Sequence, residues 1–272
     1  MGEVGRTLFE LLKESEKFSV YGFDTDKNKM REAGQTALPS EVDIIHICIP
    51  CRERDVFVEA TLGYVKQFKP RLVIIDSTTV PGASMDVYND CRCLVAHSPI
   101  RGVHEDLENM KWEVKRWTKY IGGADAEAAE AASKHFKKLG LKTRVLKGCA
   151  EAELAKLFET TYRVWMITCF QEMHRISRHF KTDFCQIVNF LADTHRTRLD
   201  RPIMFPGVVR GHCLVPNVKL LLRVYDSEFL RLALKSNEKR KEEIEDKDVQ
   251  IETEKAKVMV EDLQMELTGR RH

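Results

Sequence analysis

The segment 206–217 concentrates residue types that can carry out chemistry. It contains two glycines, two prolines and the adjacent pair His212 and Cys213, and it interrupts sequence that otherwise has a helical character. Glycine lets a ligand approach the backbone closely, proline fixes the direction of the chain, and a cysteine in such a turn is more exposed than one inside a helix. The segment is therefore either a site with Cys213 as nucleophile or a structural turn between two helices.

A second polar group lies upstream, in a stretch of helical character over 150–190. Lys156, Thr160 and Arg163 are three or four positions apart, so they share one face of a helix. A polar stripe on an otherwise apolar helix faces either a site or, as is more common for an isolated helix, solvent. The remainder of the sequence has to distinguish the two.

The first residues have the pattern of a glycine turn that opens a helix. Gly2 and Gly5 precede an apolar helical pattern, as the second and third glycines of G-x-G-x-x-G do in a dinucleotide-binding unit. With that alignment the first glycine and the strand before it would lie upstream of Met1. We therefore expect the first strand of the unit to be missing, through truncation or an internal start.

The next strand is expected over 18–23, and Asp24 follows it. Asp24 lies nineteen positions after Gly5. An acidic residue about 20 positions beyond the glycines can accept the ribose hydroxyls of NAD, and its charge repels the 2′-phosphate of NADP. An ordinary turn aspartate is the alternative. The candidate cofactor-binding residues here are Gly2, Glu3, Val4, Gly5 and Asp24.

Further apolar runs predict a sheet. The runs 42–50 and 71–79 are nearly continuous rather than alternating, which indicates strands covered on both faces and hence a parallel sheet between helices. A further apolar run lies at 93–97, and helices are expected over 54–68 and 126–139. The segments 119–123 and 143–146 bracket the second of these helices and are expected to complete the domain. In such a sheet the ligand lies beyond the carboxyl ends of the strands, where Pro50, Ser77 and Thr78 fall. These three residues complete the candidate cofactor site.

The length of 272 residues predicts two domains. We expect a doubly wound parallel Rossmann-type sheet over 1–146, an all-helical domain over 147–235 and a charged helical tail over 236–272. Apolar residues recur every seven positions in the tail, but their companion positions are charged, which favours a solvated helix or a frayed tail over a coiled coil. The apolar positions are Ile244, Ile251, Val258 and Met265, and the companions are Lys247, Glu254 and Glu261.

Composition excludes several classes of protein. A net charge of +2 gives no electrostatic reason to expect nucleic acid or a membrane surface, and no apolar run approaches the roughly 20 residues that span a bilayer. No signal peptide opens the chain. Eight scattered cysteines fit reduced thiols and a cytoplasmic location. The spacings Cys48-x-x-Cys51 and Cys91-x-Cys93 have no matching histidine cluster, so no metal site is expected.

In their order, these motifs resemble the UDP-glucose/GDP-mannose dehydrogenase family of nucleotide-sugar dehydrogenases, from Gly2 to about Leu222. The markers are the Gly2 and Gly5 turn with Asp24, the sequence DSTTVPG at 76–82, HSP at 97–99, KYIGG at 119–123, AELAKLFETTYR at 152–163 and GHC at 211–213. Each is modest alone, and together they are specific.

The resemblance implies an NAD-dependent enzyme that acts on a small molecule, a sugar nucleotide or a related hydroxy acid, and that forms a homodimer through its helical domain. Cys213 would attack the aldehyde formed by a first oxidation, the thiohemiacetal would lose a second hydride, and water would hydrolyse the thioester. Lys156 would supply positive charge to the developing oxyanion. His212 would orient or polarise the thiol, or serve only a structural purpose.

The sequence also departs from the family pattern. Ile100 replaces a glutamate, Thr160 an asparagine and Asn217 an aspartate, and Val208 and Arg210 stand where glycines are usual. A charged helix is expected where the family carries a third, nucleotide-binding domain. These changes keep open an alternative, a catalytically silent NAD-binding or metabolite-binding homologue or a dimeric scaffold. The candidate catalytic residues are Cys213, Lys156, Thr160, Asn217 and His212.

Overall fold

The structure is a computed structural model that describes residues 1–26, 28–29, 38–102 and 106–269. The chain divides into two compact units, Met1–Lys156 and Leu157–His272. The first contains a sheet covered by helices and the second is helical throughout its described residues. The α/β class predicted from the sequence is confirmed.

A five-stranded sheet in the order β1-β2-β3-β4-β5 forms the core of the first unit. The first three strands lie within the predicted apolar runs, and the last two lie in the segments 119–123 and 143–146 that were expected to complete the domain. All four residues of the second strand are buried, which explains why its run does not alternate. The strands are β1 (Ile44–Ile47), β2 (Leu72–Ile75), β3 (Leu94–His97), β4 (Lys119–Gly123) and β5 (Thr143–Val145).

The sheet is mixed rather than wholly parallel as expected. Neighbouring strands are parallel except β3 and β4, where Ala96 pairs with Gly123 in antiparallel register. A parallel neighbour requires a connection that crosses back to the other end of the sheet. The connection between β3 and β4 instead contains the short helix α5 (Leu107–Arg116), which packs against the N-terminal helix α1 (Glu3–Glu14). The chain therefore re-enters the sheet in the opposite direction.

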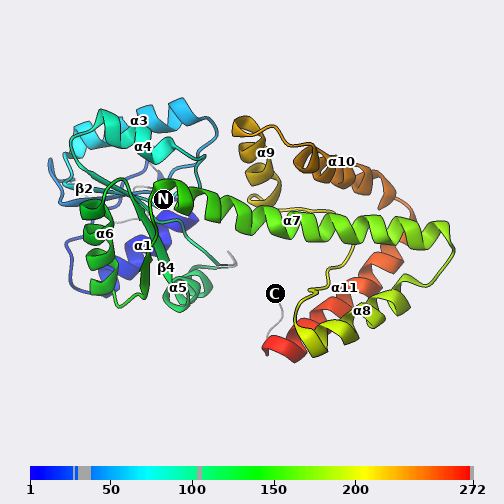
Figure 1. Cartoon of the computed structure of the whole chain (residues 1–272). Helices are drawn as coiled ribbons and strands as arrows, with labels where there is room; N and C mark the ends of the chain where they lie inside the picture. The colour runs from blue at the N-terminus through cyan, green and yellow to red at the C-terminus, as the bar shows by residue number, and fades with distance from the viewer. Residues whose placement is uncertain (27, 30–37, 103–105, 270–272) are drawn as a thin grey trace. The chain divides into compact units, whose positions relative to one another are not determined.

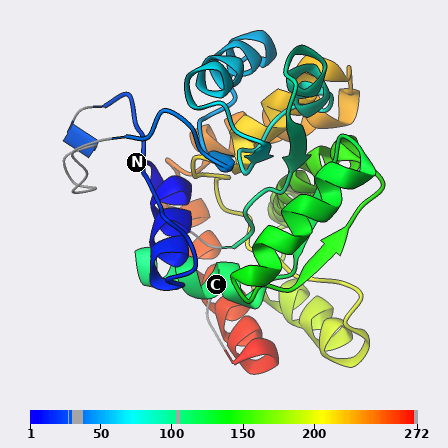
Figure 2. The ribbon, with the colours of Figure 1, turned by 90° about the vertical axis from the view of Figure 1, so that its left-hand side faces the viewer.

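Helices cover both faces of this sheet. The paired helices α3 (Arg54–Phe68) and α4 (Ala83–Asp90) lie on one face, and α1 and α6 (Ala126–Lys138) lie on the other (Figures 1 and 2). Leu8 of α1 and Phe136 of α6 share one buried apolar cluster with Ile74 and Ile121 of the strands. The helices thus hold the carboxyl ends of β1 and β2 in fixed places.

The strand predicted over 18–23 is wrong. Residues 18–24 have no regular secondary structure and belong to none of the five strands of the described sheet. The apolar pattern favours a strand there, but a strand is stable only with a neighbour that completes its ladder of backbone hydrogen bonds. Tertiary context therefore overrides the local pattern.

The second unit begins within the long helix α7 (Cys149–His179). The helical stretch expected over 150–190 is divided at 180–183, where Lys181 has a φ of 53° and the Asp183 side chain accepts a hydrogen bond from the Cys185 amide. The helical domain expected over 147–235 is also interrupted before Glu228, where the Ser227 side chain caps the next helix by accepting from the Leu230 amide. The remaining helices are α8 (Phe184–Arg198), α9 (Leu214–Val224), α10 (Glu228–Glu243) and α11 (Lys247–Thr268).

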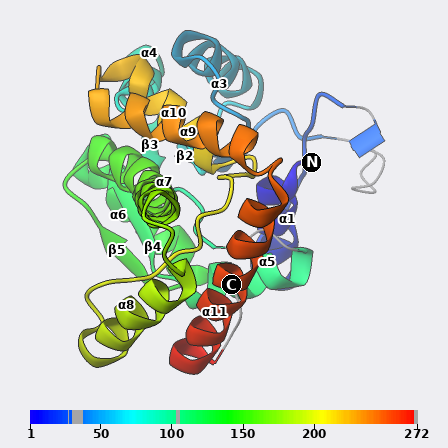
Figure 3. The same cartoon turned by 90° about the vertical axis from the view of Figure 1, so that its right-hand side faces the viewer.

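Helix α11 is not a solvated tail helix, because one of its faces is buried against α8 (Figure 3). Val249, Ala256 and Val260 are at most 5% exposed, whereas the seven-residue series Ile251 and Val258 is on the opposite face, about half exposed. The buried face has the spacing of an ordinary amphipathic helix. Across the part of the chain that the structure describes, none of the helices is long and apolar enough to cross a membrane.

Candidate functional site

The predicted dinucleotide-binding turn opens α1. Gly2 is the N-cap residue in an extended conformation, and the helix begins at Glu3. A Cβ added at Gly2 would meet nothing within 4 Å, whereas a Cβ added at Gly5 would lie 3.5 Å from Cβ of Cys48, just after β1. The start of α1 therefore lies at the carboxyl end of β1, where the positive end of the helix dipole favours an anion.

Asp24 lies beside this turn. Its Oδ2 is 3.4 Å from the Met1 amino group, and its Oδ1 accepts a hydrogen bond from the Asp26 amide at 2.9 Å. Burial raises the pKa of Asp24, but the Asp26 hydrogen bond and the amino group outweigh it, so the net pKa is lowered. The structure thus brings Gly2, Glu3, Val4 and Gly5 together with an ionised Asp24.

The other predicted cofactor residues follow β1 and β2. Pro50 is exposed after β1, and Ser77 and Thr78 follow β2. The Ser77 hydroxyl donates to the Ile47 carbonyl at 3.0 Å, which ties the two strand ends together. Because β1 and β2 are parallel, all three residues lie at the same edge of the sheet.

The loop 77–82 is organised by Glu153, whose importance the sequence did not reveal. The buried Glu153 carboxylate accepts hydrogen bonds from the amides of Gly82 at 2.7 Å and Ser84 at 2.9 Å, and from the hydroxyls of Ser84 at 2.7 Å and Thr79 at 3.3 Å. It therefore caps the N-terminus of α4. The Gly82 and Ser84 amides therefore donate to a carboxylate of the protein itself.

A chain of buried polar groups runs through the sheet. Lys119 Nζ lies 3.0 Å from one oxygen of Asp76, and His46 Nδ1 lies 2.7 Å from the other. The Nε2 atoms of His46 and His135 are 2.9 Å apart. Both ring nitrogens of His46 form hydrogen bonds if Nδ1 donates to Asp76 and Nε2 accepts from His135. Sequence reasoning missed this cluster, although a histidine inside the apolar run of β1 was a signal for it.

The charges in this cluster follow from its burial. Burial raises the pKa of Asp76, but Lys119 and His46 outweigh it and the net pKa is lowered. Burial lowers the pKa of Lys119, opposed by Asp76. Burial, reinforced by His46, lowers the pKa of His135 to about 3. The cluster is therefore an ion pair of Asp76 and Lys119 with a neutral His135.

The segment with the predicted nucleophile lies in the second unit. Cys213 is half-buried at the N-cap of α9, and its carbonyl accepts from the Asn217 amide at 3.0 Å. His212 is exposed, and Gly211 has a φ of 95°, which a residue with a side chain rarely adopts. An anion formed at the Cys213 sulfur would lie at the positive end of the α9 dipole.

The structure joins two further predicted residues directly. Nδ2 of Asn217 donates to Oγ1 of Thr160 at 3.0 Å, and Thr160 donates to the Leu157 carbonyl at 2.9 Å. Both side chains are buried. The two departures from the family pattern therefore form one neutral pair. Lys156 lies one turn before Thr160 on α7 and is partly exposed.

The third departure, Ile100, is 4% exposed and belongs to the apolar core of the first unit. The side chain that replaces the family glutamate therefore serves packing. It offers no proton to a reaction.

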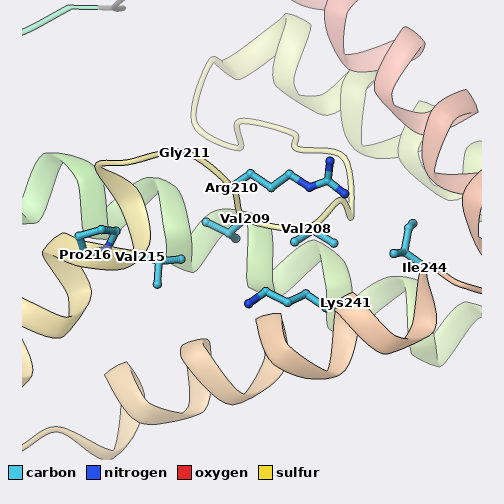
Figure 4. Close-up of a pocket in the computed structure, with 8 residues that line it drawn as sticks. All are labelled: Val208, Val209, Arg210, Gly211, Val215, Pro216, Lys241 and Ile244. Carbon is cyan, nitrogen blue, oxygen red and sulfur yellow. The ribbon is translucent and has the colours of Figure 1, made fainter. Parts of the chain in front are cut away.

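A hollow of about 520 Å³ lies beside the glycine turn within the second unit. Its apolar surface comes largely from valines, and the cationic side chains of Arg210 and Lys241 lie on either side of Val208 and Val209 (Figure 4). Lys241 also pairs with Glu238 at 2.8 Å. The full lining is Val208, Val209, Arg210, Gly211, Val215, Pro216, Lys241 and Ile244.

Comparison with known proteins assigns the helical part of the chain. Residues 150–239 match the central domain of the UDP-glucose/GDP-mannose dehydrogenase family. The UDP-N-acetyl-D-mannosamine dehydrogenase of Methanocaldococcus jannaschii is 31% identical over 192 residues, which are 65% of this chain and 43% of the relative. Over residues 150–239 the chain is thus similar to the UDP-glucose/GDP-mannose dehydrogenase family. The family resemblance recognised in the sequence is thereby confirmed.

A second relative extends the match. The UDP-N-acetyl-D-mannosamine dehydrogenase of Pyrococcus horikoshii is 28% identical over 232 residues, which are 78% of this chain and 54% of the relative. The chain thus spans about half the length of these two dehydrogenases.

Solved dehydrogenase structures share the fold. The UDP-D-ManNAc dehydrogenase of Pyrococcus horikoshii superposes with a TM-score of 0.63 at 21% identity, covering 85% of this chain and 61% of its own. A 3-hydroxyisobutyrate dehydrogenase from Mycobacterium tuberculosis gives a TM-score of 0.65 at 12% identity, covering 90% and 91%. At these identities the likeness concerns architecture alone.

Proposed function

We propose that this chain takes part in the NAD-dependent oxidation of an alcohol group of a sugar nucleotide or a related hydroxy acid. The observation that carries the proposal is the 31% identity over 192 residues with a UDP-N-acetyl-D-mannosamine dehydrogenase. The glycine-opened helix α1 and the neighbouring Asp24 support a dinucleotide as cofactor.

The residues at the start of α1 fit a dinucleotide. The space beside Gly2 is open, and the first turn of the helix presents amides that no preceding turn can use. Asp24 would accept the ribose hydroxyls, and Pro50, Ser77 and Thr78 would lie below the cofactor. NAD, when bound, would accept the hydride of the substrate alcohol.

Cys213 would act as nucleophile toward an aldehyde. Its sulfur forms a bond to the carbonyl carbon while the thiol proton moves to the carbonyl oxygen. Lys156 would stabilise the negative charge that develops on that oxygen before the proton reaches it, and His212 would orient the thiol. The paired Thr160 and Asn217 would hold the start of α9 and act on the reaction only through Cys213.

We further infer a homodimer formed through the helical unit. Several large apolar side chains of α7, of α8 and of the turn between them are at least half exposed there, which is typical of a protein–protein interface. They are Phe158, Tyr162, Phe180 and Phe190. Light scattering coupled to gel filtration tests the stoichiometry. The eight cysteines, all free thiols in the structure, support a reducing cytoplasmic location.

Formation of NADH, followed by absorbance, tests the activity. UDP-N-acetyl-D-mannosamine, UDP-glucose and 3-hydroxyisobutyrate form the substrate panel, and Cys213→Ser is the matched variant. We expect reduction of NAD with at least one substrate and loss of any acid product in the variant. NAD that raises the melting temperature without turnover would favour a silent homologue. No response to NAD in either measurement would reject the proposal.

A further inference from the structure

Two buried amide side chains hold the turn before Cys213. Asn237 of α10 accepts from the Val209 amide through Oδ1 at 2.7 Å and donates to the Val209 carbonyl through Nδ2 at 3.2 Å. Gln171 of α7 donates to the Gly207 carbonyl at 2.7 Å. The two side chains are 1% and 0% exposed. Asn237 therefore pairs with the turn as a neighbouring strand would, offering one donor and one acceptor.

The same turn is fixed again on its other side. Asn217, four residues beyond Cys213, is buried and bonded to Thr160. Between the two anchors, Arg210, Gly211 and His212 are exposed and Cys213 is half-buried. The residues of the proposed chemistry thus form a short exposed span between buried attachments.

The amide pair is itself held by a wider network. The Gln171 side-chain oxygen accepts from the Ser236 hydroxyl at 2.8 Å, and Ser236 accepts from Arg175 at 2.9 Å. The fully buried Arg240 donates to the Gln171 carbonyl at 3.0 Å. The Nη1 atom of Arg240 lies 3.2 Å from Nδ1 of His174. Each contact restricts the rotamers of the groups that grip the turn.

The network ends on α11. Nε2 of His174 lies 2.8 Å from the Glu252 carboxylate, which also pairs with Arg178 at 2.9 Å. A continuous series of contacts therefore leads from the charged C-terminal helix through α7 and α10 to the backbone of Val209. This explains why α11 is packed and not frayed.

We infer that Asn237 and Gln171 are positioning residues that set the exposure of Cys213 by fixing the backbone at 207–209. The inference rests on the proposed function only in that Cys213 is the group whose placement matters. Removing Asn237 leaves a buried amide and a buried carbonyl without partners, so the turn must open to water. The thiol then becomes more accessible while the rest of the helical unit keeps its packing.

Alkylation of the native chain by iodoacetamide, with peptide mass spectrometry, tests the inference. The rate at Cys213 is compared with the rate at the exposed Cys169 on α7, which serves as internal reference. The variants are Asn237→Ala and Gln171→Met. The matched control is Ser177→Ala, which removes another buried side-chain bond to a loop carbonyl, that of Thr182 at 3.1 Å. Melting curves establish that every variant is folded at the labelling temperature.

We expect the ratio of the Cys213 rate to the Cys169 rate to rise roughly tenfold in Asn237→Ala and several-fold in Gln171→Met, as loss of one or two buried hydrogen bonds predicts. Ser177→Ala leaves the ratio unchanged. A ratio within about twofold of the unmodified chain in the folded variants overturns the inference, as does equal acceleration at both cysteines. If Asn237→Ala does not fold, Gln171→Met decides.

The outcomes separate this inference from the proposed function. A changed labelling ratio in a chain that never reduces NAD keeps the positioning role and rejects the oxidoreductase. Turnover with an unchanged ratio in the variants keeps the oxidoreductase and rejects the positioning role.

Discussion

Asn217 and Thr160, 57 positions apart, share one hydrogen bond of 3.0 Å between an amide nitrogen and a hydroxyl oxygen. The resemblance places an aspartate and an asparagine at these positions in the family. Both positions differ from the pattern that the resemblance implies, and in this chain the two side chains are hydrogen-bonded to each other.

This pairing predicts energetic coupling. Thr160→Val and Asn217→Ala should each lower the free energy of unfolding by roughly 1 to 3 kcal/mol, because each leaves the other buried polar side chain without this hydrogen bond. The double variant should lose less than the sum, with a coupling of about 1 kcal/mol. Urea unfolding of the four chains measures the cycle. Additive losses would show that the bond contributes nothing of its own.

Asp24 should determine the choice of cofactor. Asp24→Ala removes the carboxylate that would bind the ribose hydroxyls, so we expect NAD affinity to fall by roughly tenfold or more and the preference over NADP to diminish. Calorimetric titration with both dinucleotides measures the change. Asp26→Ala, an exposed neighbour, is the control. Equal NAD affinity in the two variants would remove Asp24 from the site.

Glu153 should stabilise the first unit through the start of α4. Glu153→Gln keeps one acceptor oxygen but turns an NH₂ group toward amides that need an acceptor, so we expect a loss of about 2 to 3 kcal/mol in unfolding free energy. The exposed Glu59→Gln on α3 should change it by less than about 0.5 kcal/mol. Chemical denaturation compares the two. A similar small effect at both positions would contradict the capping role.

His135 should make the first unit sensitive to acid. Its pKa is lowered to about 3 by burial and by His46, against an ordinary value of about 6.5. The unfolded chain therefore binds a proton that the folded chain refuses between these values. The full stability is present above pH of about 6.5 and falls as the pH drops toward about 3.

The variant His135→Phe should flatten this dependence, because it removes the group whose protonation the fold opposes. Unfolding free energies measured at several pH values between about 7 and 4 give the slope. His179→Ala, at an exposed histidine on α7, is the matched control. An unaltered slope in His135→Phe would show that other groups cause the acid sensitivity.

Helix α11 offers a test of its packing by two substitutions in one turn. Ala256→Asp places a charge on the face buried against α8, and we expect a loss of at least about 3 kcal/mol or failure to fold. Val258→Asp places the same charge on the exposed face and should cost less than about 1 kcal/mol. Comparable melting temperatures for both would mean that α11 does not pack as described.

The sequence predicted local features well and distant contacts poorly. Apolar runs located the first three strands of the described sheet, and the glycine turn located the start of α1, because burial and backbone freedom are properties of neighbouring residues. The strand expected at 18–23 failed because a strand depends on its partner. The direction of β4 failed because it depends on where α5 packs.

The candidate site shows the same division. Residue type and spacing are enough to make Cys213 and Asp24 candidates. The hydrogen bonds between the Asn237 side chain and the Val209 backbone could not be predicted. Asn237 lies 28 positions away on α10, and an asparagine in a helix has no distinctive pattern. Glu153 and Lys119 were visible as members of motifs, but their roles depend on burial, which alone makes their charges consequential.

The carboxylate of Glu153 occupies the position that a phosphate oxygen takes at many helix starts, so the loop after β2 carries its anion as part of the polypeptide. The loop therefore has its shape before a ligand binds, because Glu153 holds it. A diphosphate near this loop would be repelled by the Glu153 carboxylate, whereas the start of α1 favours an anion. Glu153 would therefore influence how a bound dinucleotide is oriented without contacting it.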